Sequence, residues 1–316
     1  MTPNNTQMKT NPDDLIHWKN WNPEEIRDIL HLAENVQADP LAYAQSMRAK
    51  TLVMLFQKTS TRTRVSFEAG MTEMGGHAIY LDWQNSNFGL TRTEYEAAYL
   101  SSNAHLIMAR VKEHQTLIDL QKGSLVPVIN GCCDQYHPCQ GMADFLTLKQ
   151  DAGELKGLRL SYLGVFNNVV NTLVSLSLVF GVELTLACPI RPQEDVDWKS
   201  LEALKAAGLL TETLDPKEAV KNADYVYTDT WVNMEHFNDP KSQHLKDERV
   251  KLMIDYQLNH KLLAGSKAKV MHDMPIHPGY EISDELVADP RSIIFAQAKN
   301  RLVAQKAIML RLLKQA

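Results

Sequence analysis

The strongest constraint on the fold is an alternation of apolar, strand-like runs with helical segments along nearly the whole chain. The apolar runs are rich in residues that favour strands, and they lie near residues 51–57, 77–82, 106–111, 126–131, 158–164, 182–188, 224–228 and 268–272. Helical patterns lie near residues 23–36, 61–74, 93–103, 114–121, 137–150, 167–180, 195–206 and 215–222, and from about 293 to the end. Such alternation is typical of parallel sheets covered by helices on both faces. We therefore predict an α/β fold with doubly wound parallel sheets.

The length and one polar break predict two domains. The chain has 316 residues, about twice the ~150 residues of a typical domain. Its 44% hydrophobic content is enough for two sizeable cores. The segment Asp151–Gly157 is polar and contains two glycines, as linkers often do. We place the domain boundary in this segment.

Composition and charge exclude several classes of protein. Thirty-three Lys and Arg residues against 38 Asp and Glu give a net charge of −5, so no global positive field attracts nucleic acid. No stretch approaches the ~18 apolar residues of a membrane span, and the polar start lacks the pattern of a signal peptide. We expect a cytoplasmic protein. Adjacent cysteines at Cys132 and Cys133, near His137 and Cys139, lack the spacing of zinc ligands, so we predict no metal site.

The segment Ser60–Arg64 indicates an anion site. It follows the apolar run 51–56 and opens the predicted helix 61–74, so its side chains lie at a strand-to-helix turn. A helix N-terminus offers unpaired backbone N–H groups and partial positive charge, to which this segment adds three hydroxyls and two arginines. An ordinary Ser60 N-cap followed by a solvated basic turn is the alternative. The interleaved arginines and hydroxyls favour a phosphate site.

Polar residues also follow three other predicted strands, at the sheet edge where parallel folds bind ligands. Arg110 ends the run 106–111, where a surface cation would fit equally well. His137 and Gln140 are three residues apart and share one face of a helix, although His137 as a simple helix cap is an equal alternative. Asn167 and Asn168 follow the run 158–164, and asparagine pairs are common in turns.

Together these motifs closely resemble those of the aspartate/ornithine carbamoyltransferase family, in particular its ornithine branch. Cys139 stands where the aspartate enzymes usually carry threonine. The matching segments occur in family order and comprise Ser60–Arg64, His137–Gln140, Asn167–Asn168, Asp229–Met234 and Asn300–Leu302. The resemblance covers residues 15 to 316 approximately, which makes it far more specific than any single short motif.

The resemblance implies an activity. The δ-amine of L-ornithine would attack the carbonyl carbon of carbamoyl phosphate, giving L-citrulline and phosphate, a step of arginine metabolism. No cofactor and no metal is implied, because the catalytic task is to position the substrates and to stabilise the oxyanion and the leaving phosphate. Synthesis and breakdown share one transition state, so both directions remain open.

The resemblance also assigns roles to residues. The implied catalytic residues are Arg62, Arg110, His137 and Asp273. The implied ligands of carbamoyl phosphate are Ser60, Thr61, Arg62, Thr63, Arg110, His137, Gln140, Met274 and Arg301, with Asn87 supplied by a neighbouring subunit from the loop 84–89. The implied ligands of ornithine are Asn168, Asp229, Asn233 and Met234.

Two residues of the implied acceptor site differ from the ornithine enzymes. Asp273 replaces the cysteine of their His-Cys-Leu-Pro segment. A carboxylate can orient or deprotonate an ammonium group, but it also raises the pKa of the amine. Asn233 replaces a serine, keeping hydrogen-bonding ability and adding bulk. Asp229 is retained, and its carboxylate suits a free α-amino group, which favours ornithine over an N-acylated acceptor.

The architecture implied by the resemblance has two domains. Residues 1–150 would bind carbamoyl phosphate, residues 151–290 would bind the amino acid, and a final helix at 291–316 would return to the first domain. Active sites between subunits imply a homotrimer or a multiple of trimers. Domain closure would follow, with carbamoyl phosphate binding first.

Three rival functions are considered. Another amine acceptor, such as putrescine, would leave the phosphate site intact and make Asp229 less necessary. A non-catalytic protein that binds carbamoyl phosphate is suggested only by Asp273. A dinucleotide-dependent dehydrogenase would need a Gly-x-Gly-x-x-Gly segment after a strand, and the sequence has none.

Overall fold

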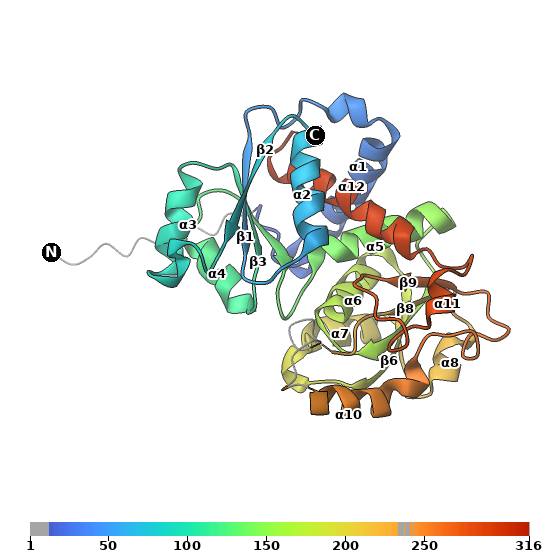
Figure 1. Ribbon diagram of the computed structural model, residues 1–316. Helices are drawn as coiled ribbons and strands as arrows, with labels where there is room; N and C mark the ends of the chain where they lie inside the picture. Colours follow the sequence, from blue (N-terminus) through green and yellow to red (C-terminus); the bar gives the residue numbers. More distant parts are fainter. Residues whose placement is uncertain (1–12, 233–236, 238–240, 242, 316) are drawn as a thin grey trace. The chain divides into compact units, whose positions relative to one another are not determined.

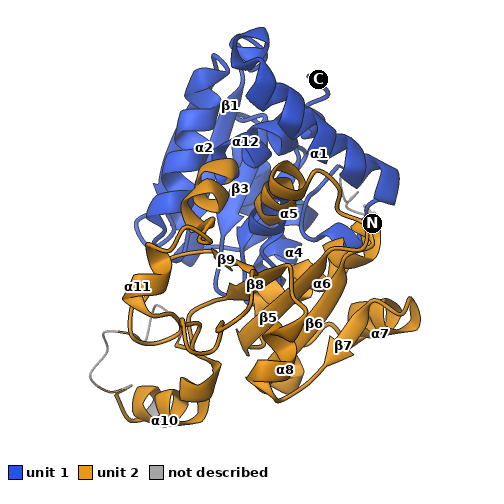
Figure 2. Cartoon of the chain, turned by 90° about the vertical axis from the view of Figure 1, so that its right-hand side faces the viewer, with its two compact units in different colours: residues 1–142, 301–316 blue, residues 143–300 orange. Residues whose placement is uncertain are grey.

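The computed structural model describes residues 13–232, 237, 241 and 243–315, and it divides into two compact units (Figures 1 and 2). Unit 1 comprises residues 1–142 and 301–316, and unit 2 comprises residues 143–300. The dividing points fall inside two helices, whereas the sequence-based boundary lies at 151–157. Every strand and helix predicted from the sequence is present, with its ends shifted by a few residues.

Unit 1 is built on a parallel sheet in the order β2-β1-β3-β4. Its strands are β1 (Thr51–Phe56), β2 (His77–Asp82), β3 (Leu106–Arg110) and β4 (Val128–Cys132). Its helices are α1 (Pro23–Ala38), α2 (Thr61–Glu73), α3 (Thr93–Ser101), α4 (His114–Gly123) and the start of α5 (Pro138–Ala152), with the short 3₁₀ helices η1 (Trp18–Asn20), η2 (Pro40–Tyr43) and η3 (Asn87–Gly89).

Helices cover both faces of the unit 1 sheet, as predicted. Val53 and Leu55 of β1 point to one face and belong to a buried cluster that includes Leu100 of α3 and Leu117 of α4. Figure 1 shows α3 and α4 on the opposite side of the sheet from α2. Because both faces are covered, β1 is apolar and buried along nearly its whole length rather than on alternate residues.

Unit 2 has a second parallel sheet, in the order β7-β6-β5-β8-β9. Its strands are β5 (Arg159–Val165), β6 (Glu183–Ile190), β7 (Leu210–Glu212), β8 (Tyr225–Thr228) and β9 (Lys269–His272). Its helices are α6 (Asn168–Phe180), α7 (Trp198–Ala206), α8 (Pro216–Lys221), α10 (Gln243–Met253), α11 (Asp284–Val287) and the start of α12 (Ile294–Leu312), with η4 (Gln193–Asp195) and η6 (Ile254–Tyr256).

The C-terminal part of α12 returns to unit 1, as the resemblance implied. A Cβ atom at Gly70 of α2 would come within 3.2 Å of the Lys306 side chain, so glycine permits the close approach of the two helices. Lys306 then pairs with Glu73 at 2.9 Å, and Arg311 pairs with Glu25 of α1 at 2.6 Å. Two ion pairs and a glycine contact therefore fix this helix against α1 and α2.

Among the strands and α-helices of the described residues, three were not predicted from the sequence. The edge strand β7 has three residues and α11 has four, both too short for a periodic pattern. The third is α10, whose sequence carries many charges and shows no clear apolar face. Within the described ranges, no helix combines the length and the apolar character that a membrane crossing requires.

Candidate active site

The first part of the site lies at the N-terminus of α2 in unit 1. Ser60 is the N-cap: its Oγ accepts the Thr63 backbone N–H at 3.3 Å and donates to Thr63 Oγ1 at 3.0 Å. Thr63 is fully buried, while Thr61, the first residue of the helix, is exposed. The turn after β1 therefore presents hydroxyls together with the unpaired N–H groups of a helix start, a suitable arrangement for an anion.

Arg301 joins this turn from the other end of the chain. Its Nη2 donates to Thr63 Oγ1 at 2.8 Å across 238 residues of sequence, and both side chains are buried. Because Thr63 Oγ1 accepts hydrogen bonds from both Ser60 and Arg301, its own hydrogen can be donated to a ligand oxygen. The return of α12 thus adds a fixed cation to the α2 N-terminus.

Arg110 and His137 come from the two neighbouring strands. Arg110 is the last residue of β3, where the register with β4 shifts between Ala109 and Arg110; such irregularities often redirect a side chain near a site. His137 follows β4, and its carbonyl accepts the N–H groups of Gln140 and Gly141 at the start of α5. The backbone carbonyl of His137 therefore caps α5.

The imidazole of His137 lies in a strongly positive environment. His137 and Gln140 are 3% and 1% exposed. Burial, and then the positive charges of Arg301, Arg110 and Arg62, hold the pKa of His137 well below its ordinary value. The structure thus brings these three predicted arginines together around a neutral imidazole, which can donate one hydrogen bond and accept another.

The loop that carries His137 is held by residues that sequence reasoning missed. The buried Asn130 Nδ2 donates to the carbonyl of Ile16 at 2.9 Å and to that of Tyr136 at 3.3 Å. Trp18 Nε1 donates to the Pro138 carbonyl at 2.9 Å. The contacts with Ile16 and Trp18 span 114 and 120 residues of sequence, so no local pattern could have indicated them.

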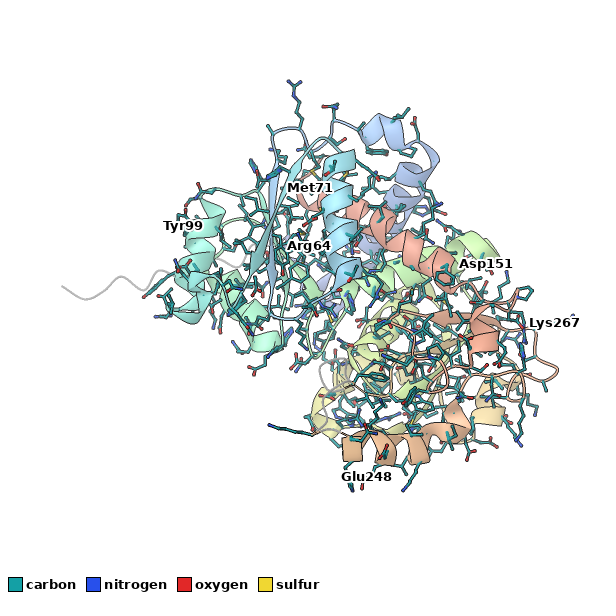
Figure 3. The ribbon with its side chains drawn as sticks, in the orientation of Figure 1. Arg64, Met71, Tyr99, Asp151, Glu248 and Lys267 are labelled. Atoms are coloured by element: carbon teal, nitrogen blue, oxygen red, sulfur yellow. The ribbon has the colours of Figure 1, made fainter. Side chains whose placement is uncertain are left out.

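Arg64 differs from the other cations of its motif. Its Nε donates to Glu68 at 2.9 Å, and its guanidinium lies 4.0 Å from the centre of the Tyr80 ring. Figure 3 labels Arg64 on α2. The prediction that Arg64 contributes to the anion site is therefore replaced by a surface ion pair with a cation–π contact.

Two other predicted ligands of carbamoyl phosphate belong to other segments of the chain. Asn87 is exposed on η3, next to Phe88, whose buried ring packs 4.5 Å from that of Trp83. Met274 belongs to unit 2, where it follows β9 with a φ of 62°, a left-handed conformation that is uncommon for a residue with a side chain.

The second part of the site lies in unit 2, at the ends of β5 and β8. Asp229 follows β8 and is 5% exposed. One of its carboxylate oxygens accepts the Asn167 side-chain amide at 2.6 Å, and the other accepts the Thr230 backbone N–H at 2.6 Å. Asn168 is the first residue of α6, directly beside Asn167. Asn233 and Met234 lie outside the described residues.

The loop after β9 supplies a second carboxylate. Asp273 is 9% exposed, and its Oδ1 lies 3.7 Å from Nδ1 of the fully buried His272. His272 Nδ1 accepts the Met274 N–H at 2.8 Å, so its hydrogen is on Nε2, which faces Glu281 at 3.1 Å. Burial alone would raise the pKa of Glu281, but hydrogen bonds from His272 and His277 lower it to about 2. Glu281 is therefore ionised and fixes the orientation of His272.

The carboxylates of Asp229 and Asp273 both affect the same buried tyrosine, Tyr162. Burial, and then the negative charges of Asp229 and Asp273, raise the pKa of the buried Tyr162 well above its ordinary value. Among the residues that the structure describes, the side chains of Asp229, His272 and Asp273 also offer ligand atoms within 4.8 Å of one another. Both nitrogens of His272 are already engaged, so the group suits an organic cation better than a metal ion.

The sequence matches one protein family along nearly its whole length. Residues 13–150 match the carbamoyl-P binding domain of aspartate/ornithine carbamoyltransferase, and residues 156–312 match the Asp/Orn binding domain of the same family. An ornithine carbamoyltransferase of Methanosarcina acetivorans is 40% identical over 307 residues, which cover 95% of this chain and 99% of that protein. One from a Vibrio species is 37% identical over 306 residues, with coverage of 96% and 100%.

Solved structures give the same result. The ornithine carbamoyltransferase of Pyrococcus furiosus superimposes with a TM-score of 0.86 at 36% identity, covering 94% of this chain and 96% of that one. The enzyme of Thermus thermophilus gives a TM-score of 0.84 at 35% identity, with coverage of 96% and 100%.

Proposed function

The chain belongs to the aspartate/ornithine carbamoyltransferase family, and from this premise we propose how it transfers a carbamoyl group from carbamoyl phosphate to the δ-amine of L-ornithine. The products are L-citrulline and phosphate. One observation supports the assignment of the site. The positive charges of Arg301, Arg110 and Arg62 all lower the pKa of the buried His137, beside the N-terminus of α2. This group suits an anion that gains charge during the reaction.

In unit 1 we assign the phosphate to Ser60, Thr61, Thr63, Arg62 and Arg301. The leaving phosphate takes the electron pair of the breaking C–O bond, and the guanidinium groups and helix N–H groups stabilise the added charge. We assign the carbonyl oxygen to Arg110 and His137, and the carbamoyl amide to Gln140. A neutral His137 supports this role, because it can donate a hydrogen bond to the oxyanion without carrying a charge of its own.

In unit 2 we assign the α-ammonium group of ornithine to Asp229 and the reacting end to Asp273, with Asn168, Asn233 and Met234 as further ligands. The δ-ammonium must lose one proton before attack, and the nitrogen loses a second as the tetrahedral intermediate collapses; one of these protons leaves with the phosphate. We propose that Asp273 accepts the first proton. Its position beside His272, which the ionised Glu281 orients, supports the assignment.

The acceptor is tested with a panel of amines. We expect citrulline from ornithine at a rate far above that of carbamoylated product from putrescine, because putrescine keeps both ammonium groups of ornithine but lacks the α-carboxylate that the acceptor site would also bind. Faster turnover of putrescine would replace ornithine as the acceptor. Absence of product with every amine would indicate a binding protein.

We further propose a cytoplasmic homotrimer or multiple of trimers, in which Asn87 reaches the carbamoyl phosphate site of a neighbouring subunit. The exposed position of Asn87, on a turn anchored by Phe88, supports such a role. Met274 of unit 2 is a further proposed ligand of carbamoyl phosphate. Sedimentation equilibrium at several concentrations tests the trimer, and a monomer mass throughout would contradict it.

We propose a carbamoyl phosphate domain of residues 1–150 with the helix at 291–316, and an ornithine domain of residues 151–290. The two family matches meet between residues 150 and 156, which supports this division.

A further inference from the structure

We propose that Asn167 is a positioning residue of the acceptor site, which fixes the Asp229 carboxylate in the orientation that binds an α-ammonium group. The inference rests on the proposed function, because that function assigns the ammonium group to Asp229. It adds a residue that the resemblance did not assign to any role, and it follows from the hydrogen bonds around Asn167.

The orientation of the Asn167 amide is determined by its partners. Asn167 is the N-cap of α6, and its Oδ1 accepts the backbone N–H groups of Val169 at 3.0 Å and Val170 at 3.3 Å. An amide nitrogen could not satisfy these donors, so Oδ1 must face the helix. Nδ2 therefore faces away from α6 and donates to Asp229 Oδ2 at 2.6 Å. One side chain thus joins the start of α6 to the end of β8.

Asp229 is held from its other side by its own turn. Its Oδ1 accepts the Thr230 N–H at 2.6 Å, and Thr230 Oγ1 donates to the Val232 carbonyl at 2.7 Å. Each carboxylate oxygen then has one donor that fixes it and a further lone pair for a ligand. The orientation of the buried carboxylate is therefore determined by two donors from different strand ends.

Asn167 is an uncharged donor, and this affects how Asp229 can bind a ligand. An amide orients a carboxylate without neutralising it, whereas an Arg or Lys partner at the same distance would offset its charge. Asp229 consequently keeps its negative charge for a cationic ligand while losing rotational freedom. This combination is suited to an α-ammonium group, which needs both the charge and a fixed direction.

The test replaces Asn167 with Asp. Asn167→Asp keeps an oxygen acceptor of the same shape for the Val169 and Val170 N–H groups, so the α6 cap is retained. It replaces the donor to Asp229 by a second carboxylate oxygen. We expect the KM for ornithine and the Kd for L-norvaline, which keeps the α-ammonium group but lacks the reacting amine, to rise about ten- to a hundredfold. The KM for carbamoyl phosphate should change by less than about twofold.

A second ligand separates positioning from general damage to unit 2. 5-Aminopentanoate has the terminal amine and the carboxylate of ornithine but no α-ammonium group. Its inhibition constant should change by less than about twofold in Asn167→Asp. An equal rise for 5-aminopentanoate and L-norvaline would overturn the inference, since it would show that the pocket as a whole had been distorted.

Two further variants serve as controls. Asn167→Ser keeps a capping oxygen and adds no charge, so it should raise the Kd for L-norvaline by only about three- to tenfold. Asp215→Asn makes the reverse exchange at the N-cap of α8, where Asp215 Oδ1 accepts the Lys217 and Glu218 N–H groups. It should leave the Kd for L-norvaline and the inhibition constant of 5-aminopentanoate unchanged.

Isothermal titration of L-norvaline into protein saturated with carbamoyl phosphate keeps this test separate from the reaction, because L-norvaline lacks the reacting amine. Wild-type protein that binds L-norvaline but makes no citrulline would overturn the proposed reaction and leave the binding comparison readable. An Asn167→Asp protein with wild-type affinity for L-norvaline would overturn the role of Asn167 and leave the reaction standing. Failure of the wild-type protein to bind L-norvaline at all would contradict both.

Discussion

The proposed phosphate site of unit 1 and the proposed acceptor site of unit 2 are built at equivalent places with opposite charge. Both lie where parallel strands end, after β1, β3 and β4 in one unit and after β5, β8 and β9 in the other. Unit 1 gathers guanidinium groups around the neutral His137. Unit 2 gathers the carboxylates of Asp229 and Asp273 near His272. The same sheet edge therefore serves an anion or a cation, depending only on the side chains that follow each strand.

Two buried carboxylates extend the comparison. Burial raises the pKa of Asp14 in unit 1 to about 6, despite hydrogen bonds from Val128 and Gln121. Burial acts in the same direction on Glu281 in unit 2, yet hydrogen bonds from His272 and His277 lower its pKa to about 2. An ionised carboxylate is thus tolerated inside unit 2 because the hydrogen bonds from His272 and His277 outweigh the effect of burial, whereas burial outweighs the hydrogen bonds to Asp14.

The largest expected effect separates two arginines of one motif. Arg62→Ala should lower kcat by about 10²–10³-fold, because it removes a preorganised cation from the leaving phosphate. Arg64→Ala should change kcat by less than about threefold, because its charge is paired with Glu68 at the surface. Steady-state rates of citrulline formation for the two variants provide the measurement. Equal losses would show that Arg64 belongs to the phosphate site after all.

The second prediction concerns the acceptor side. Asp273→Asn should lower kcat by about 10²-fold, since an amide cannot accept the proton of the δ-ammonium. It should leave the KM for carbamoyl phosphate nearly unchanged. Asp284→Asn, on an exposed residue of α11, is the matched control and should behave like wild type. If Asp273→Asn retained full turnover, another group would have to be the base.

The smallest effect tests the buried carboxylate of unit 1. Folded Asp14 has a pKa of about 6, above its ordinary value of 3.8, so the folded state binds the proton more tightly. Protonation of Asp14 therefore stabilises the folded protein as the pH falls from about 7 to about 5, by about 1 kcal/mol relative to Asp14→Asn. Urea unfolding of both proteins at pH 7.5 and 5.0 measures the difference. A wild-type protein that loses stability relative to the variant on acidification would show that the sign is wrong.

The sequence indicated the phosphate site better than the acceptor site, for a physical reason. Ser60–Arg64 is contiguous, and a strand followed by capping hydroxyls and arginines predicts an anion site from local chemistry. The contact of Arg301 with Thr63 spans 238 residues and was expected only through the family resemblance. Even within the motif, position alone could not show that Arg64 turns toward Glu68 and Tyr80.

The supporting residues of unit 2 could not be predicted in this way. Glu281 reaches His272 through a loop, and Asn167 reaches Asp229 across neighbouring strands, so neither pairing leaves a periodic signal. Asn167 looked like a turn residue because its capping role dominates the local sequence. The parallel sheets were predictable because buried strands and helices each leave a strong local pattern, whereas the charged helix α10 does not.

The most direct test of the account is a crystal structure with N-(phosphonoacetyl)-L-ornithine, which joins the two substrates in one molecule. We predict that its phosphonate lies at the N-terminus of α2 in contact with Arg62 and Arg301, and that its α-ammonium group contacts Asp229. A phosphonate bound away from the α2 N-terminus would contradict the central claim that this turn is the phosphate site.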